Sequence, residues 1–258
     1  MNCKNCYTKL SEHDDYCRNC GGRVIRNRLS FKNLFEHISE TFFNYDNKLL
    51  RTFIDLLTKP EAVIDGYVKG IRKRYVNPLS YLGIALTLSG ITFFLMKKAN
   101  FHIDVDVFNQ GMDEATKNKI GDMSSEYSSF FFLSYIPILV ISSWLILKEV
   151  KYNFTERTVT FIYGMAEFSL MTTIPSILVM FLLPEHYMSF SFFSLLILGI
   201  YLMWLLYRLS KLKGITFFAQ ILVFLFLFVI LFFGFYLAIT VIGFLTGELN
   251  IQDFAPKK

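Results

Sequence analysis

Five long apolar runs, separated by short polar segments, constrain this chain more than any other feature of its sequence. The runs extend over residues 78–96, 129–147, 159–183, 188–207 and 215–245. The hydrocarbon core of a bilayer is about 30 Å thick, and a helix needs about 20 apolar residues to cross it. A helix also satisfies its own backbone hydrogen bonds where no water is present. The pattern predicts an all-α polytopic membrane protein, with about five transmembrane helices forming a bundle over residues 78–247.

The last run is longer than one upright crossing requires. Its 31 residues would form a helix of about 46 Å at about 1.5 Å per residue, which is too short for two crossings. We expect one tilted or partly interfacial helix, followed by a polar tail over residues 248–258. The alternative is a run that folds back, which would return the tail to the inner side of the bilayer.

The distribution of charge separates a polar N-terminal part from the apolar runs. Residues 1–77 contain 23 charged side chains, whereas residues 79–95 contain none. No run long enough for a secretory signal peptide precedes residue 78, so we expect the N-terminal part to stay in the cytoplasm. With that orientation, 20 of the 26 Lys and Arg residues lie on the inner side, as the positive-inside rule requires. We therefore expect a multi-pass protein of the cytoplasmic (inner) membrane, with its C-terminus outside.

All four cysteines lie within the first 20 residues, as two Cys-x-x-Cys pairs. The pairs are Cys3 with Cys6 and Cys17 with Cys20, and ten residues separate them. Two residues between thiolates let one tight turn direct both sulfur atoms at one ion, and four thiolates form the tetrahedral shell of a structural Zn²⁺ site. A reducing compartment favours metal ligation over disulfide bonds. The pattern predicts a small zinc ribbon over residues 1–25.

The surroundings of the cysteines indicate a structural role for the ribbon. Gly21 and Gly22 follow the second pair, where a positive φ would turn backbone amides toward the sulfurs. His13 could replace one ligand, although a single His in a polar loop is usually exposed. Four thiolates leave no open position for water or substrate, so we expect the zinc to hold structure rather than to catalyse. Mixed charges on the ribbon favour a protein partner over nucleic acid. They are Glu12, Asp14, Asp15, Arg18 and Arg23.

Residues 26–77 have the pattern of a cytoplasmic, amphipathic helical connector. Its apolar residues recur at helical spacing in two sets. The sets are Phe31, Leu34, Phe35, Ile38 and Phe42, and then Leu49, Leu50, Phe53, Ile54 and Leu57. These helices either pack together under the membrane domain or lie in the headgroup region of the bilayer.

A cluster of basic residues precedes the first span. Its members are Lys69, Arg72, Lys73 and Arg74. Anionic lipids attract such clusters on the cytoplasmic side, which makes these residues candidate contacts to lipid headgroups. The alternative is an ordinary topology determinant of the positive-inside rule.

Glu167 is the one charged side chain expected well inside a span. A carboxylate is expensive there, so it should face the bundle interior, pair with a polar group or carry a proton. Helical geometry places Tyr163 and Met171 on its face, and Pro175 interrupts the same helix. A polar stripe on the opposite side consists of Ser169, Thr172, Thr173 and Ser176. These groups could line a proton or solute path, or they could belong to a packing helix with one hydrogen-bonded Glu.

Over nearly its full length, the chain resembles a bacterial family of zinc-ribbon membrane proteins, domain of unknown function 3667, and three segments carry the resemblance. The segments are Arg28-Leu29-Ser30-Phe31-Lys32-Asn33-Leu34, Phe53-Ile54-Asp55-Leu56-Leu57-Thr58-Lys59-Pro60 and Tyr75-Val76-Asn77-Pro78-Leu79-Ser80-Tyr81. The resemblance implies an architecture and no activity. A fainter likeness, to the Yip1-type five-span proteins, rests on architecture alone and would indicate membrane organisation or trafficking.

Three classes of function remain open from the sequence. The motifs of zinc proteases, serine hydrolases, P-loop proteins and dinucleotide-binding enzymes are absent, which disfavours an enzyme. The first hypothesis is therefore a non-enzymatic scaffold or regulator whose ribbon binds a protein and whose spans contact membrane lipids. The second is a small transporter or proton-linked permease that uses Glu167. A membrane enzyme comes third, and a homo-oligomer is compatible with each.

Overall fold

The computed structural model describes residues 1–22, 24, 48–99, 128–148, 150–210 and 214–246. The chain forms two compact units, Met1–Asn47 and Lys48–Lys258, and each is described by itself. The first apolar set of the connector, residues 31–42, lies outside the described residues, as does the tail over residues 248–258.

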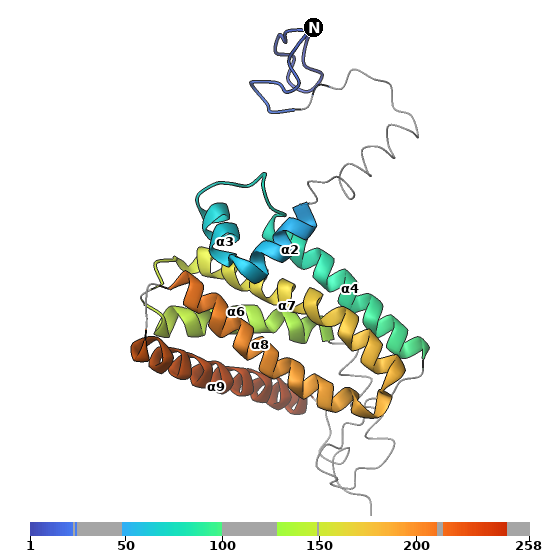
Figure 1. The fold of residues 1–258 in the computed structure, drawn as a ribbon, viewed down its shortest axis with the longest axis vertical. Helices are drawn as coiled ribbons and strands as arrows, with labels where there is room; N and C mark the ends of the chain where they lie inside the picture. Colours follow the sequence, from blue (N-terminus) through green and yellow to red (C-terminus); the bar gives the residue numbers. More distant parts are fainter. Residues whose placement is uncertain (23, 25–47, 100–127, 149, 211–213, 247–258) are drawn as a thin grey trace, which may run out of the picture. The chain divides into compact units, whose positions relative to one another are not determined.

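All regular secondary structure in the described part of the second unit is helical (Figure 1). The helices are α2 (Lys48–Thr58), α3 (Pro60–Val68), α4 (Pro78–Lys98), α6 (Ser128–Ile146), α7 (Phe154–Leu182), the short 3₁₀ helix η1 (Pro184–His186), α8 (Tyr187–Leu209) and α9 (Ile215–Thr246). In the first unit Asn2 and Lys9 form an isolated antiparallel bridge, and none of the described residues belongs to a β-strand. The all-α prediction is confirmed.

In the described part of the chain, four helices are long and apolar enough to cross a membrane: α4, α7, α8 with η1, and α9. The apolar part of α6, Phe130–Ile146, is shorter. Its 17 residues would extend about 26 Å, which is near the lower limit for a crossing. The last apolar run is one continuous helix of 32 residues, so the described part of it does not fold back. The protein is a membrane protein.

The third span begins earlier than its hydropathy predicts. Asn153 forms a capping box with Glu156, in which each side chain accepts a hydrogen bond from the other residue's backbone amide. This start signal places the first turn of α7 at Phe154, whereas the apolar run begins at residue 159. Arg157, which precedes the apolar run, is therefore a residue of α7, and it is buried.

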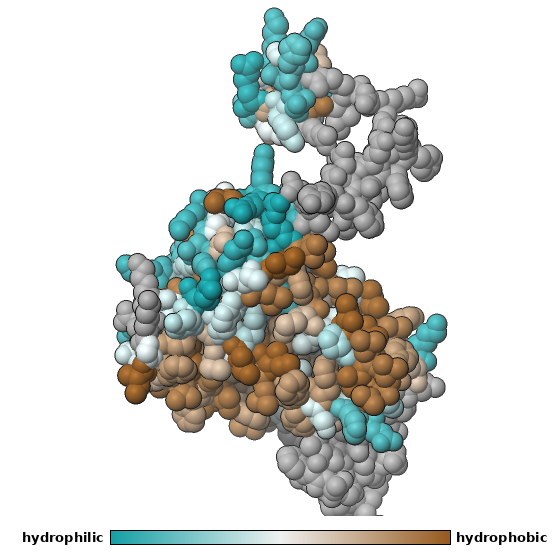
Figure 2. Space-filling view, in the orientation of Figure 1, coloured by the Kyte–Doolittle hydropathy of each residue, from teal (hydrophilic) through white to brown (hydrophobic). Residues whose placement is uncertain are grey.

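Helix α7 lies at the centre of the bundle, where it contacts α4, α6 and α8. At Gly164, a Cβ atom would stand 3.0 Å from the side chain of Leu205, so the glycine allows α7 and α8 to approach closely. The main contact of α9 is α6. Large apolar side chains on the outer faces stay exposed, and Figure 2 shows hydrophobic surface over the flank of the bundle. This is the surface expected to face lipid.

The core of the bundle lies at the end where α2 and α3 pack. Helix α7 is buried mainly between Arg157 and Ser169, in its N-terminal half. Helices α2 and α3 contact α7, and α3 also contacts α8. This part of the connector thus packs against the membrane domain, and its contact with the headgroup region of the bilayer stays a prediction. The first apolar set, residues 31–42, is not tested.

Candidate functional sites: a cysteine cluster and a buried carboxyl group

The four thiols of the first unit converge on one point. Their sulfur atoms lie within 4.8 Å of one another, with 3.6 Å between Cys3 and Cys20 and 3.5 Å between Cys6 and Cys17. Zinc–sulfur bonds of about 2.3 Å in a tetrahedron place sulfur atoms about 3.8 Å apart. All four cysteines are free of disulfide bonds. The donor set therefore fits a tetrahedral metal ion.

The two cysteine pairs have the same backbone geometry. The amide of Tyr7 donates to the carbonyl of Cys3 at 2.9 Å, and the amide of Gly21 donates to the carbonyl of Cys17 at 2.8 Å. Both donors adopt a left-handed conformation, with φ of 60° at Tyr7 and 68° at Gly21. The two Cys-x-x-Cys pairs thus fold into two equivalent turns. A left-handed conformation is rare for a bulky side chain, and Tyr7 is 80% exposed.

Hydrogen bonds within these turns favour the thiolate form of two cysteines. Bonds from the side chain and backbone of Thr8 lower the pKa of the Cys6 thiol to about 6. The backbone amide of Gly22 and the side chain of Asn5 lower the pKa of Cys20. Metal ligands must be deprotonated, so these contacts favour metal binding at neutral pH.

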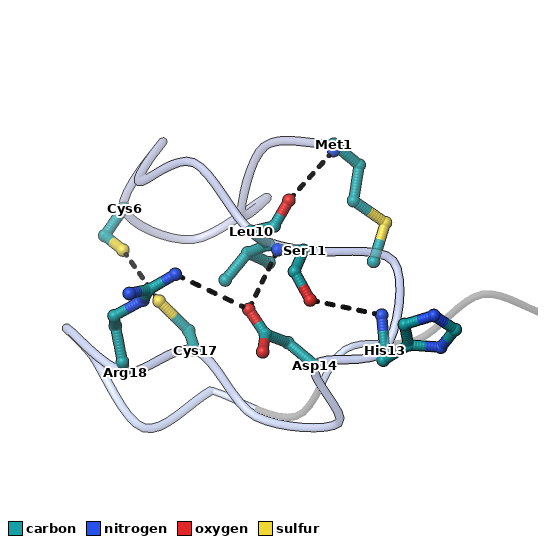
Figure 3. Close-up of polar contacts among 8 residues, drawn as sticks. All are labelled: Met1, Cys6, Leu10, Ser11, His13, Asp14, Cys17 and Arg18. Atoms are coloured by element: carbon teal, nitrogen blue, oxygen red, sulfur yellow. Dashed lines mark hydrogen bonds and ion pairs between the residues drawn. The ribbon is translucent and has the colours of Figure 1, made fainter.

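His13 lies apart from the sulfur atoms, on the loop between the two turns (Figure 3). Its backbone amide donates to the hydroxyl of Ser11, and its side chain is exposed. Asp14 closes the same loop by accepting from the amide of Ser11 at 2.9 Å, and its carboxylate lies 4.0 Å from Arg18. In the described part of the first unit, the groups that could hold a metal are the four cysteines.

The second candidate site is the carboxyl group of Glu167 on α7. Its side chain is fully buried, and the hydroxyl of Tyr81 on α4 donates to Oε2 at 2.5 Å. The other oxygen, Oε1, is buried without a hydrogen-bond partner. Tyr201 on α8 is also buried, and its hydroxyl likewise has no partner. Three helices therefore bring polar groups to one place in an apolar bundle.

Tyr163 shares a face with Glu167, but its hydroxyl binds elsewhere. It donates to the backbone carbonyl of Val76 at 2.6 Å, just before α4 begins. Its ring lies 6.1 Å from the ring of Tyr81. The sequence predicted Tyr163 beside the carboxyl group and missed Tyr81, the residue that binds it. No local pattern could reveal this pair, because 86 residues separate Tyr81 from Glu167.

The polar stripe of α7 is satisfied without Glu167. Thr172 donates to the carbonyl of Phe168, and Thr173 donates to that of Ser169. The hydroxyls of Ser169 and Ser89 lie 2.9 Å apart. Pro175 is exposed, and α7 continues through it to Leu182. The structure therefore brings neither Pro175 nor the stripe into contact with the carboxyl group.

A polar network joins α2 to the start of the first span. The hydroxyl of Tyr75 donates to Asp55 at 2.8 Å, and the amide of Val76 donates to the hydroxyl of Thr52 at 3.0 Å. Burial and the bond to Asp55 raise the pKa of Tyr75, whereas the positive charges of Arg74 and Arg51 oppose that rise. The network fixes the entry to α4 on the side chains of α2.

Arg157 closes the turn between α6 and α7. Its guanidinium donates to the carbonyls of Tyr152, Ser143, Leu147 and Val150 at 2.7–3.0 Å and to the hydroxyl of Ser143 at 2.6 Å. These carbonyls belong to the last turn of α6 and the loop after it, where a cation is favourable. In the sequence, this capping role is indicated only by the position of an Arg next to an apolar run.

The four basic residues before α4 are exposed. The ammonium group of Lys69 lies 3.5 Å from Asp65. The guanidinium groups of Arg72 and Arg74 lie over the rings of Tyr67 and Tyr75, at 5.5 and 5.4 Å. Because these four side chains are exposed, lipid headgroups can reach them. Binding of headgroups by these residues stays a prediction.

Comparison with known proteins supports the family resemblance. Residues 46–90 match the family model described as "Protein of unknown function (DUF3667)". The matched segment contains all of α2 and α3, the network around Tyr75 and the N-terminal part of α4. No curated protein and no solved structure matches the chain. The chain is thus a membrane protein that shares a segment with a family of unknown function, and the likeness to Yip1-type proteins stays a prediction.

Proposed function

We propose that this protein is a non-enzymatic membrane scaffold or regulator whose ribbon binds a protein partner. The observation that carries the proposal is the closed cysteine cluster, in which four sulfur atoms lie within 4.8 Å of one another. Four thiolates would complete the shell of a Zn²⁺ ion and leave no position for a substrate. The ion would hold the ribbon together and would do no chemistry.

The surface of the ribbon supports protein binding. Tyr7 and Tyr16 are 80% and 57% exposed, and aromatic side chains are enriched at protein interfaces. Acidic and basic groups are mixed around them, as in the pair of Asp14 and Arg18. A surface of mixed sign does not favour the phosphate backbone of nucleic acids.

Crosslinking to partners in cells tests this proposal. We expect the Cys17→Ser, Cys20→Ser variant to lose a specific partner that the wild type and His13→Ala both retain. A Tyr7→Gly variant relieves the left-handed strain and keeps the four ligands, so loss of the partner there would assign the contact to the aromatic ring. Each variant must insert normally in the membrane. A partner profile unchanged by loss of the cysteines contradicts the proposal.

A second candidate function is a proton-linked transporter that uses Glu167. One observation favours it. Tyr81 binds one oxygen of the buried carboxyl group, whereas the other oxygen and the buried hydroxyl of Tyr201 have no hydrogen-bond partner. Intramembrane carboxyl groups commonly belong to proton pathways. In this proposal the carboxyl group gains and loses a proton as α4, α7 and α8 rearrange around it.

Flux measurements in proteoliposomes separate the two candidates. The transporter hypothesis predicts that Glu167→Gln abolishes any proton-coupled flux, whereas Tyr201→Phe changes its pH dependence. The matched control is Ser169→Ala, which alters a buried polar group of the same helix. If Glu167→Gln leaves flux and growth unchanged, the carboxyl group is structural and this candidate fails.

A further inference from the structure

The apolar stripe of α2 faces away from the protein. The side chains buried against the bundle are Thr52, Asp55 and Leu56. Leu50 and Ile54, on the opposite side of the helix, are 54% and 47% exposed. A helix on a water-soluble protein normally buries its apolar side. Here two of the three buried side chains are polar, and the outer side is apolar.

The polar side of α2 has specific reasons to face inward. Thr52 accepts from the amide of Val76, and Asp55 accepts from the hydroxyl of Tyr75. Asp55 also lies 3.3 Å from the ammonium group of Lys59. These contacts fix the rotation of α2 about its own axis. The outward direction of Leu50 and Ile54 therefore follows from the hydrogen bonds.

The outer face is wide enough to enter a membrane surface. At 100° per residue, four apolar side chains fall within an arc of about 100° opposite the buried residues. They are Leu50, Phe53, Ile54 and Leu57, and we call them the outer face of α2. Phe53 and Leu57 are half-buried. An interfacial helix has such a face, together with basic residues at its edge.

Both the charge and the position of α2 favour lipid as the occupant of this face. Arg51 lies on α2, and its charge and that of Arg74 both act on Tyr75. Leu79, at the start of the first span, is 67% exposed. In Figure 2 the hydrophobic surface of the bundle continues to the position of α2. The outer face of α2 is thus an extension of the surface that faces lipid, at the end where cationic side chains gather.

We propose that the outer face of α2 inserts into the headgroup region of the adjacent leaflet, with anionic phospholipids as its partner. Arg51 and Arg74 would bind the headgroups while Leu50 and Ile54 reach the upper part of the acyl chains. The inference does not depend on the function of the ribbon or of Glu167. The sequence predicted headgroup contacts for the whole basic cluster before the first span. The present proposal assigns them to the outer face of α2, Arg51 and Arg74.

Photocrosslinking of the full chain in lipid nanodiscs tests this assignment. The photoreactive residue p-benzoylphenylalanine replaces Ile54 in one variant and Thr58, an exposed polar residue of α2, in a matched control. A third variant carries it at Phe226, which is 68% exposed on α9 and reports ordinary lipid contact. The discs contain phosphatidylglycerol and phosphatidylcholine, and adducts are identified by mass spectrometry.

We expect phospholipid adducts at positions 54 and 226 and few at position 58. Anionic lipid should be enriched among the adducts at position 54, and each of Arg51→Gln and Arg74→Gln should reduce that enrichment by up to about fivefold, since one basic residue near a membrane contributes about 1 kcal/mol. Adducts at position 54 to this chain, to a second copy or to another protein would overturn the proposal. So would lipid adducts at position 226 without any at position 54.

Discussion

Tyr81 of α4 and Glu167 of α7 form a buried hydrogen bond of 2.5 Å between residues that are 86 positions apart in the sequence. The bond joins the first span to the central helix near the end where α2 packs. Only one carboxyl oxygen is used, because Oε1 has no partner. A carboxyl group held in this way depends on its single donor.

Removing that donor should destabilise the bundle. Tyr81→Phe leaves both carboxyl oxygens of Glu167 unpaired, and we expect a loss of about 1–3 kcal/mol in the free energy of unfolding. Replacing both partners with apolar residues, Tyr81→Phe with Glu167→Met, should cost less than the two single changes together. Unfolding in mixed micelles measures this cycle. Strict additivity would show that the bond is energetically unimportant.

Arg157 should resist replacement even by lysine. An ammonium group cannot reach the carbonyls of the α6 end that the guanidinium binds, so Arg157→Lys should lower the free energy of unfolding by about 2–4 kcal/mol. Arg208→Lys is the matched control. It alters a solvent-screened pair with Glu61, so it should cost clearly less than Arg157→Lys. Comparable losses in the two variants would argue against the capping role of Arg157.

The Tyr75–Asp55 bond should make stability fall at alkaline pH. The folded protein raises the pKa of Tyr75 above the unfolded value of about 10, so the contribution is complete below about pH 10 and is lost as pH rises through the folded pKa. Tyr75→Phe should lower the thermal midpoint at pH 8 and weaken its fall between pH 9 and 11. Tyr7→Phe, an exposed control, should change neither. If the thermal midpoint of Tyr75→Phe falls between pH 9 and 11 as steeply as that of the wild type, other tyrosines cause the loss of stability.

Zinc content should follow the four cysteines. We expect about one zinc ion per purified chain, loss of it in Cys17→Ser, and retention in His13→Ala, measured by elemental mass spectrometry. Since Thr8 lowers the pKa of Cys6, Thr8→Val should release zinc at a higher pH during acid titration, by about one unit or less. If Thr8→Val and the wild type release zinc at the same pH, Thr8 does not influence metal binding.

Orientation in the membrane is a separate prediction. Reporter domains fused at the N-terminus and inserted near residue 110 should lie in the cytoplasm and outside it, respectively, because basic residues concentrate in the segments assigned to the inner side. A cytoplasmic signal from the insertion near residue 110 would reverse the topology and place α2 on the outer side.

The span pattern and the cysteine spacing were predictable because both depend on short-range physics. A run of apolar residues fixes a helix in lipid, and two Cys-x-x-Cys turns fix a tetrahedral donor set. Hydropathy failed at the start of α7, because a capping box extends the helix into polar sequence. It also could not give the partner of Glu167 or the inward side of α2. Both depend on contacts between residues that are far apart in the sequence, such as the bond of Val76 with Thr52, 24 residues earlier.

The contacts of α2 and α3 also constrain how the protein is made. Glu61 on α3 pairs with Arg208, 147 residues later, and Asp65 accepts from Tyr152, 87 residues later. At about 5–20 residues per second, a ribosome needs about 7–30 s to supply Arg208 after Glu61. Until α7 and α8 are made, α2 and α3 lack the helices on which they pack in the finished protein. A helix with an apolar side can bind to the membrane surface in the meantime. The outer face of α2 would therefore also protect the nascent chain from aggregation.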